Sequence, residues 1–280
     1  MTADDFRYLR ELVESHAGIF VEPGKNYLFE SRLGNVARKH GYATIARLVQ
    51  HLRASPNGPL HREAVESMTT QETSFFRDGH PFEALRKVVL PELLARRAAV
   101  RRLTIWSAAA STGQEPYSVA LLLREHFPGL AGWDVKIIAT DLCEAVLERA
   151  REGSFNRAEA ARGLPAPLLA KYFHEDAHGF RIRDDVRRSV EFRQFNLAGA
   201  WGNLPEFDLI LLRNVLIYFG QTTKRRVLEK TRGHLKPDSY LLLGAAETTL
   251  HIDEAYEVRH LERSSFYQIA GPRGTVQRGK

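Results

Sequence analysis

The sequence predicts an α/β protein in which a small all-helical domain precedes a doubly wound parallel sheet. Apolar residues in the first 70 positions recur at helical spacing, and no strand pattern competes with them there. Beyond residue 100, short apolar runs alternate with segments of helix length, which is the pattern of βαβ units. The 280 residues are 44% hydrophobic and 26% charged, a balance typical of globular proteins with one large or two small cores.

The helical domain is predicted to span residues 1–78. Its apolar positions fall into sets around Leu9, Leu33 and Leu48, in which apolar residues repeat at helical spacing. Turn residues at 22–24 and 55–59 separate helical segments, and Thr44 stands where an N-cap accepts a main-chain N–H. We therefore expect a small group of helices.

The second domain is predicted to span residues 79–272. It begins with a helix at 80–97, which Pro91 is expected to kink. Short apolar runs mark the strand candidates: residues 103–108, 135–139, 207–212 and 240–243. Helix-length segments between them predict a parallel sheet.

An irregular stretch separates the second and third of these strands. Residues 179–183 and 189–195 alternate in polarity, as short exposed strands do. We therefore predict an inserted small β-subdomain at about 174–195. At the end of the chain, residues 273–280 are rich in glycine and basic residues and are predicted to form a disordered tail.

Composition and charge exclude several classes of protein. The 40 Lys and Arg residues exceed the 34 Asp and Glu residues by six, but the excess is diffuse and no nucleic-acid motif accompanies it. No nucleic-acid partner is therefore expected. The apolar runs are far shorter than the roughly 20 residues of a membrane-spanning helix, and the first residues do not resemble a signal peptide. We expect a cytoplasmic protein, and nothing in the sequence demands more than a monomer.

No metal or disulfide site is predicted. Cys143 is the only cysteine, which excludes an intramolecular disulfide and a Cys-based zinc cluster. Residues 174–178 (HEDAH) match the pattern H-E-x-x-H, but zinc binding requires both histidines on one helical face. Because Gly179 and a strand-like run follow at once, we interpret this segment as a surface turn.

The most informative segment runs from a predicted strand through small residues into a helix, at 105–118 (IWSAAASTGQEPYS). In doubly wound sheets this first turn lies at the carboxyl end of the strand, where nucleotide-like cofactors bind. It lacks the G-x-G-x-x-G pattern, which favours a cofactor without a pyrophosphate. A tight turn that only packs the helix on the strand is the alternative.

Acidic side chains follow two of the predicted strands. Asp141 ends the second strand, where a carboxylate binds ribose hydroxyls in such folds. The alternative is a helix N-cap, because a helix is expected from about Glu144. Glu115, in the first turn, is expected to converge with Asp141 on one crevice.

Two further segments are polar within apolar surroundings, at 69–78 and 211–219. The second places Arg213 and Asn214 directly after a strand of leucines and isoleucine. Burying such a pair without partners costs several kcal/mol, so the pair must either bond a buried group or face a ligand. A structural ion pair and a ligand contact are equally compatible with this pattern.

With these motifs in view, the chain resembles the CheR family of chemotaxis receptor methyltransferases. The resemblance extends over roughly residues 5 to 270 and rests on these motifs: 69–77 (TTQETSFFR), 111–118 (STGQEPYS), 195–197 (FNL), 213–219 (RNVLIYF), and Leu243-Gly244 with Glu247-Thr248. It implies an S-adenosylmethionine-dependent enzyme that esterifies glutamate side chains on the cytoplasmic helices of chemoreceptors and releases S-adenosylhomocysteine. It also implies a Rossmann-like methyltransferase domain and a small β-subdomain that reaches the receptor, so membrane contact is expected only through the receptor.

The resemblance also implies roles for individual residues. Cofactor contacts are implied for Gln71, Thr73, Arg77, Glu115, Asp141, Asn196, Leu197, Asn214 and Val215. Within this set, Thr73, Arg77 and Glu115 would contact the methionine end, Asp141 would hold the ribose, and the last four would line the adenosine pocket. Arg77 and Tyr218 would lie nearest the reacting methyl group as catalytic residues.

The chain departs from the family pattern at a few positions. Gln71 stands where family members usually carry Asn, and Gln114 where many carry Glu. The stretch from Phe173 to Val190 is short compared with members that grip a receptor's C-terminal tether peptide. We therefore expect direct docking on the receptor helices.

A glutamate acceptor explains why no convincing catalytic dyad stands out. A solvated glutamate side chain has a pKa of about 4.3, so the nucleophile is already ionised at neutral pH and needs no general base. Alignment of the reacting groups and exclusion of water then remain as the enzyme's tasks.

Other interpretations stay open at the level of sequence. One is a methyltransferase for nucleic acid or a small molecule, although no Asn-Pro-Pro-Tyr segment of the kind that holds a flipped base is present. Another is a receptor-binding adaptor with the same fold and little turnover. A nicotinamide-dependent oxidoreductase is disfavoured by the missing glycines.

Overall fold

The computed structural model describes residues 1–56, 58–202 and 204–270, and the tail predicted at 273–280 lies outside them. The described part of the first domain consists of α1 (Ala3–Ala17), α2 (Tyr27–Lys39), α3 (Ile45–Ala54) and α4 (Pro59–Ser67). Leu9, Phe29 and Leu48 are completely buried where these helices meet. Thr44 caps α3 as predicted, since its hydroxyl accepts the N–H of Arg47 at 3.3 Å.

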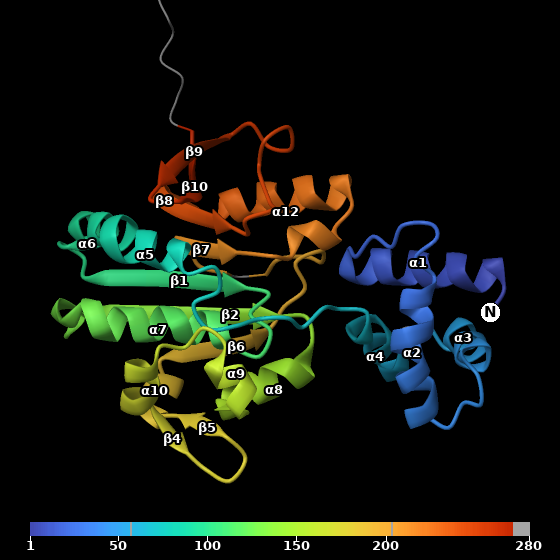
Figure 1. Ribbon diagram of the computed structural model, residues 1–280. Helices are drawn as coiled ribbons and strands as arrows, with labels where there is room; N and C mark the ends of the chain where they lie inside the picture. The colour runs from blue at the N-terminus through green and yellow to red at the C-terminus, as the bar shows by residue number, and fades with distance from the viewer. Residues whose placement is uncertain (57, 203, 271–280) are drawn as a thin grey trace, which may run out of the picture.

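The boundary predicted at residue 78 stays a proposal. Met68 still packs in the core of the helical domain, whereas Phe75 already packs in the core of the second domain. An extended segment, drawn as the thin link between the two bodies in Figure 1, joins them.

The helix predicted at 80–97 is divided into α5 (His80–Ala84), a π-helical turn η1 (Leu85–Val89) and α6 (Leu90–Arg97). Pro91, which has no main-chain N–H, follows the π-helical turn within a run of helical residues that continues from His80 to Arg97, and the kink predicted there stays a prediction. The irregular part of this helix is the wider π-helical turn, in which the N–H of Leu90 donates to the carbonyl of Leu85, five residues earlier.

The main sheet has the strand order β6-β2-β1-β7-β8-β10-β9. Its strands are β1 (Arg102–Ala108), β2 (Asp134–Asp141), β6 (Val190–Gln194), β7 (Phe207–Leu212), β8 (Leu235–Leu243), β9 (Tyr256–Leu261) and β10 (Ser264–Ile269). The first five are parallel to one another, and β9 and β10 close the sheet in antiparallel pairs. All four strands expected from the sequence are present, while β9 and β10 were not predicted.

Helices cover both faces of this sheet, as in Figure 1. They are α7 (Gln114–His126), α8 (Glu144–Glu152) and α12 (Gln221–Gly233), in addition to α5 and α6. Alternation along β1 decides the packing: Ile105 joins the core that includes α7, and Trp106 joins the core that includes α12. The doubly wound α/β class predicted from the sequence is therefore confirmed.

The inserted β-subdomain differs from its prediction at 174–195. The small sheet has the order β3-β5-β4, with β3 (Ser154–Phe155), β4 (Phe173–Glu175) and β5 (Phe180–Ile182). Short helices accompany it: α9 (Arg157–Ala161), α10 (Ala166–Tyr172) and α11 (Asp184–Arg187). Residues 190–194 instead form β6, at the edge of the main sheet beside β2, so assigning them to the insert was wrong. An edge strand with one covered face alternates in polarity just as an exposed hairpin does.

The helical domain lies beside the carboxyl ends of the parallel strands (Figure 1). Ile19 forms an antiparallel bridge with Phe219, and the N–H of Phe20 donates to the carbonyl of Tyr218 at 2.8 Å. Gly18 permits this approach: a Cβ there would lie 2.8 Å from the Thr223 side chain. The two domains thus meet at the edge where a doubly wound sheet binds its ligand.

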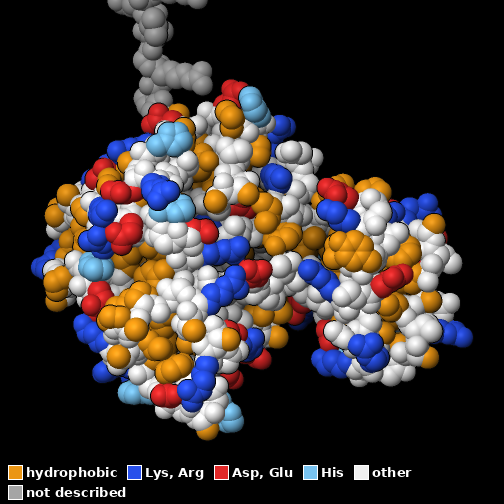
Figure 2. Space-filling model, viewed as in Figure 1, with side chains coloured by type: hydrophobic (Ala, Val, Ile, Leu, Met, Phe, Trp, Pro, Cys, Tyr) orange, Lys and Arg blue, Asp and Glu red, His pale blue; other side chains and the backbone are white. Residues whose placement is uncertain are grey.

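Two surface properties accompany this fold. Figure 2 shows Lys and Arg side chains spread among acidic ones over both domains, in line with the diffuse charge excess. No helix in the described residues is both long and apolar enough to cross a membrane.

Candidate functional site

A hollow of about 890 Å³, measured out to its mouth, opens at the carboxyl ends of β1, β2 and β7. All the residues to which the sequence assigned a cofactor or catalytic role line it: Gln71, Thr73, Arg77, Glu115, Asp141, Asn196, Leu197, Asn214, Val215 and Tyr218. The fold therefore brings together segments that are up to about 150 residues apart in the chain.

The turn between β1 and α7 forms one wall of the hollow. Ala109 and Ser111 have left-handed φ values of 58° and 52°, and Gly113 has a φ of 94°. A Cβ at Gly113 would approach the side chains of Ala150 and Tyr117 to 3.0 and 3.1 Å. The turn is thus tightly packed, and it also exposes Ala109 and Ser111 to the hollow, so both interpretations of this segment hold.

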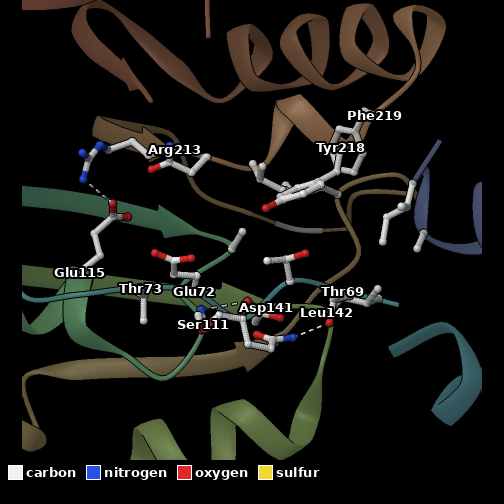
Figure 3. A pocket seen from close by; sticks show the side chains of 18 of the residues that line it. Thr69, Glu72, Thr73, Ser111, Glu115, Asp141, Leu142, Arg213, Tyr218 and Phe219 are labelled. Carbon is white, nitrogen blue, oxygen red and sulfur yellow. Dashed lines mark hydrogen bonds and ion pairs between the residues drawn. The ribbon is translucent and has the colours of Figure 1, made fainter. Parts of the chain in front are cut away.

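Asp141 lies on the same wall, where β2 ends (Figure 3). Its Oδ2 accepts the N–H of Ser111 at 2.9 Å, and its Oδ1 accepts the N–H of Cys143 at 3.0 Å. It is not the N-cap of α8, because that position belongs to Cys143. Each carboxylate oxygen keeps a further lone pair for a donor in the hollow. Burial raises the pKa of Asp141, and these N–H groups oppose the rise.

Glu115 and Arg213 lie in direct contact and are joined by a dashed line in Figure 3. Nη1 of Arg213 lies 3.0 Å from Oε2 of Glu115, and its Nη2 lies 2.7 Å from Oδ2 of Asp78. Ser107 donates to the other oxygen of Glu115 at 2.7 Å. The Arg213 side chain, which is only 1% exposed, forms a buried ion pair, and both Arg213 and Asn214 line the hollow.

Arg77 and Tyr218 both line the hollow. Nη2 of Arg213 donates to the carbonyl of Arg77 at 3.1 Å, which fixes the main chain of that residue, and Arg77 itself donates to the carbonyl of Glu72 at 3.1 Å. Tyr218 ends the 3-10 helix η3 (Leu216–Tyr218), and Figure 3 shows its hydroxyl directed into the hollow.

Two of the amide side chains predicted at the site, those of Asn196 and Gln71, already have protein partners. Asn196 donates to the carbonyl of His16 and accepts the N–H of Ala198 at 2.9 Å, so it also ties the two domains together. The side chain of Gln71 donates to the Thr69 hydroxyl, and the main-chain carbonyl of Gln71 accepts from the Ser111 hydroxyl at 3.0 Å. Gln114 is buried behind the turn and accepts from a threonine hydroxyl, so it does not line the hollow.

Some lining residues were not predicted. Ala17 and Ile19 come from the helical domain, and Leu142 follows Asp141. Hydrophobic periodicity does not predict such contacts between domains. The one local signal is Gly18, which ends α1 in a left-handed conformation at the point where the domains approach each other. Among the residues set aside, Cys143 is a buried thiol whose pKa burial raises, and His174 and His178 lie in β4 and in the following turn.

Comparison with protein families identifies the family of this chain. Residues 71–264 match the family described as CheR methyltransferase, SAM binding domain, and residues 4–69 match its all-alpha domain. The chain belongs to the CheR methyltransferase family.

Curated relatives agree with this membership. The chain is 37% identical to "Chemotaxis protein methyltransferase Cher2" of Pseudomonas putida, over 94% of this chain and 97% of that protein. It is 38% identical to "Chemotaxis protein methyltransferase 1" of Pseudomonas aeruginosa, over 91% of this chain and 93% of that protein. It is also 38% identical to "Chemotaxis protein methyltransferase" of Vibrio parahaemolyticus, over 95% and 96%.

The resemblance to this family and the cofactor that it implied are therefore confirmed: the chain is an S-adenosylmethionine-dependent methyltransferase. The hollow fits that cofactor chemically. Its buried carboxylate, Asp141, has lone pairs left for hydroxyl donors. Leu142, Leu197 and Val215 offer apolar surface to an adenine, and the turn of small residues lets a ligand approach the main chain.

Proposed function

We propose that this CheR-family enzyme methylates glutamate side chains of chemoreceptors and produces glutamyl methyl esters. The observation that carries the proposal is the combination of family membership with a hollow that both Arg77 and Tyr218 line. A glutamate is ionised at neutral pH, so its carboxylate can attack without a general base. S-adenosylmethionine supplies an activated methyl group on its sulfonium.

The residues around the hollow would divide the binding of the cofactor. Thr73, Arg77 and Glu115 would contact the methionine end, with Gln71 beside them. Glu115 can do so in a fixed position, because Ser107 and Arg213 hold its two carboxylate oxygens. Pre-set side chains of this kind lower the entropic cost of binding.

The other end of the cofactor would lie over the opposite wall. Asp141 would accept from the ribose hydroxyls, for which its ionised form offers the most lone pairs. The adenosine pocket would be formed by Asn196, Leu197, Asn214 and Val215. Of these, Leu197 is buried and offers apolar surface.

Arg77 and Tyr218 would align the acceptor. The guanidinium would attract the glutamate carboxylate or hold that of the cofactor, and the phenol of Tyr218 would donate a hydrogen bond to the acceptor. Together with the ring of Phe219, the tyrosine would also keep water from the reacting atoms.

A second hollow, which meets the first at Tyr218 and Phe219, suggests the acceptor's route. It lies between α2 and the segment after η3, and the two hollows share Ile19 and Thr70 as well. On its rim Phe20 is 48% exposed and Ile217 is 46% exposed. We propose that the receptor helix packs on these apolar side chains while its glutamate reaches Tyr218.

The small sheet β3-β5-β4 supports direct docking over tether binding. The connection from β4 to β5 is short, and the sheet has three strands of two or three residues each. We propose that the enzyme docks on the methylated helices themselves without first holding a receptor tail.

Labelled S-adenosylmethionine and a chemoreceptor cytoplasmic fragment test the function. We expect label on the fragment that alkali releases as volatile methanol, which identifies a carboxyl methyl ester. Alkali-stable label would contradict glutamate as acceptor, and absence of label despite tight S-adenosylhomocysteine binding would favour the adaptor interpretation. Nucleic acid in place of the fragment should receive no label.

A further inference from the structure

The segment after β7 carries Asn214, Val215 and Tyr218, and a distant carboxylate holds it. Oε2 of Glu247 accepts the N–H groups of Asn214 and Gly244, each at 2.7 Å. Its Oε1 accepts the N–H of Val215 at 2.9 Å and that of Ile217 at 3.2 Å. Glu247 is buried, and its four bonds come from main-chain donors.

No regular secondary structure supplies acceptors for these four main-chain N–H groups. Asn214 has a left-handed φ of 57°, and η3 begins two residues later. The first N–H groups of a helix lack partners within it, and negative charge is favoured beside them. Glu247 therefore acts as a cap that is supplied from about thirty residues further along the chain.

Gly244 provides the room for this arrangement. A Cβ at that position would lie 2.7 Å from the Nδ2 atom of Asn214, 2.7 Å from Oε2 of Glu247 and 2.8 Å from the main-chain nitrogen of Asn214. Its φ is not left-handed, so glycine is required there for space and not for backbone conformation. The end of β8 is thus shaped to receive the segment.

We propose that Glu247 is a positioning residue of the cofactor site. It sets the main chain of residues 214–217 so that Asn214 and Val215 face the hollow and Tyr218 reaches its mouth. Glu247 itself does not line the hollow and acts only through these residues. The proposal rests on the roles proposed above for Asn214 and Val215 in cofactor binding.

Glu247→Gln tests this with S-adenosylhomocysteine binding measured by calorimetry. A glutamine keeps the size but turns an NH2 group toward two of the four donors. We expect the dissociation constant to rise about tenfold or more, as the loss of hydrogen bonds to a charged group predicts. Glu257→Gln is the matched control, because this exposed glutamate of β9 loses the same charge away from the segment; its affinity should stay within about twofold.

A double-mutant cycle separates positioning from a general effect on the fold. If Glu247 acts through Asn214, then Glu247→Gln should cost clearly less affinity in an Asn214→Ala background than in the parent. Equal losses in both backgrounds, with an unchanged circular dichroism spectrum, would overturn the proposal, as would parental affinity in Glu247→Gln.

Gly244→Ala provides a second variant if Glu247→Gln does not fold. It keeps the glutamate at position 247, but the added Cβ would press on both Oε2 of Glu247 and the main chain of Asn214, so it should weaken S-adenosylhomocysteine binding in the same direction. Parental affinity in Gly244→Ala would also overturn the proposal. Because these measurements use only the cofactor product, their outcome is independent of whether the acceptor is a chemoreceptor glutamate.

Discussion

The main sheet carries a buried ion-pair network at each end of its parallel strands, the amino edge and the carboxyl edge. Only the network at the carboxyl edge borders the hollow. At the amino ends of the strands, Asp208 is completely buried and accepts from Arg97 at 2.6 Å, from Lys236 at 2.8 Å and from the N–H of Thr104 at 2.8 Å. At the carboxyl ends, the network of Arg213 borders the hollow through Glu115.

The difference shows how similar chemistry serves two purposes. Around Asp208 every partner is part of the protein, and Arg97 continues the network to Asp238 at the start of β8. The side chain of Glu115 is 12% exposed and lines the hollow. We infer that the amino-edge network joins strands and helix for stability, whereas the carboxyl-edge network holds side chains ready for a ligand.

The largest expected effect follows from breaking the amino-edge network. Asp208→Ala leaves Arg97 and Lys236 without their buried partner, and we expect the free energy of unfolding to fall by about 3 to 5 kcal/mol. Urea denaturation measures this loss. S-adenosylhomocysteine affinity of the folded protein should stay within about twofold, and a parallel loss of affinity would contradict the assignment of this edge to stability.

At the carboxyl edge, Glu115→Gln should affect both stability and binding. Loss of the charge on one partner of Arg213 should lower the free energy of unfolding by about 1 to 3 kcal/mol. It should also weaken S-adenosylhomocysteine binding about tenfold or more. Asp78→Asn is the matched control, since Asp78 pairs with the same arginine but does not line the hollow. Equal losses of binding in both variants would contradict a direct role for Glu115.

Tyr218→Phe should change turnover alone. Its hydroxyl points into the hollow, so its removal should lower kcat about tenfold, the equivalent of one hydrogen bond in the transition state, without changing stability or cofactor affinity. Methyl transfer and thermal unfolding measure the two effects. Tyr27→Phe, at a 60% exposed position, is the control and should leave kcat unchanged. A parental kcat in Tyr218→Phe would remove Tyr218 from the mechanism.

The smallest effects concern pH, and their signs differ between the edges. Burial raises the pKa of Asp141, so ionisation of this residue opposes folding above the raised pKa, and the cost disappears as pH falls through it. Hydrogen bonding to Arg97 lowers the pKa of Asp238, so its stabilisation is present above the ordinary pKa and is lost as pH falls through the lowered one.

Urea denaturation between neutral pH and pH 3 measures these contributions. Subtracting the curve of Asp141→Asn from that of the parent should leave a contribution that becomes more stabilising toward acid. The same subtraction with Asp238→Asn should leave one that becomes less stabilising. Two contributions of the same sign would contradict the contrast between a desolvated carboxylate and a paired one.

Local patterns predicted much of this fold because they depend on neighbours in the chain. The periodicity around Leu9, Leu33 and Leu48 found helices, and the cap at Thr44 is an interaction over three residues. Prediction failed where the same local pattern suits two environments. The alternation of residues 190–194 fits an exposed hairpin and an edge strand equally, and only pairing with β2 distinguishes them.

The sequence by itself determined the fold class, because strand alternation and turn chemistry are written in consecutive residues, and its motifs carried the family resemblance that implied the cofactor and the residues around the hollow. Only the tertiary structure decided which polar groups face the ligand and which support them. Arg213 meets Glu115 across 98 positions of the chain, and Glu247 meets the N–H of Asn214 across 33. Buried charges and main-chain donors need partners, and these partners lie far away in the chain, where no local pattern shows them. They therefore pair only after the sheet has brought them together.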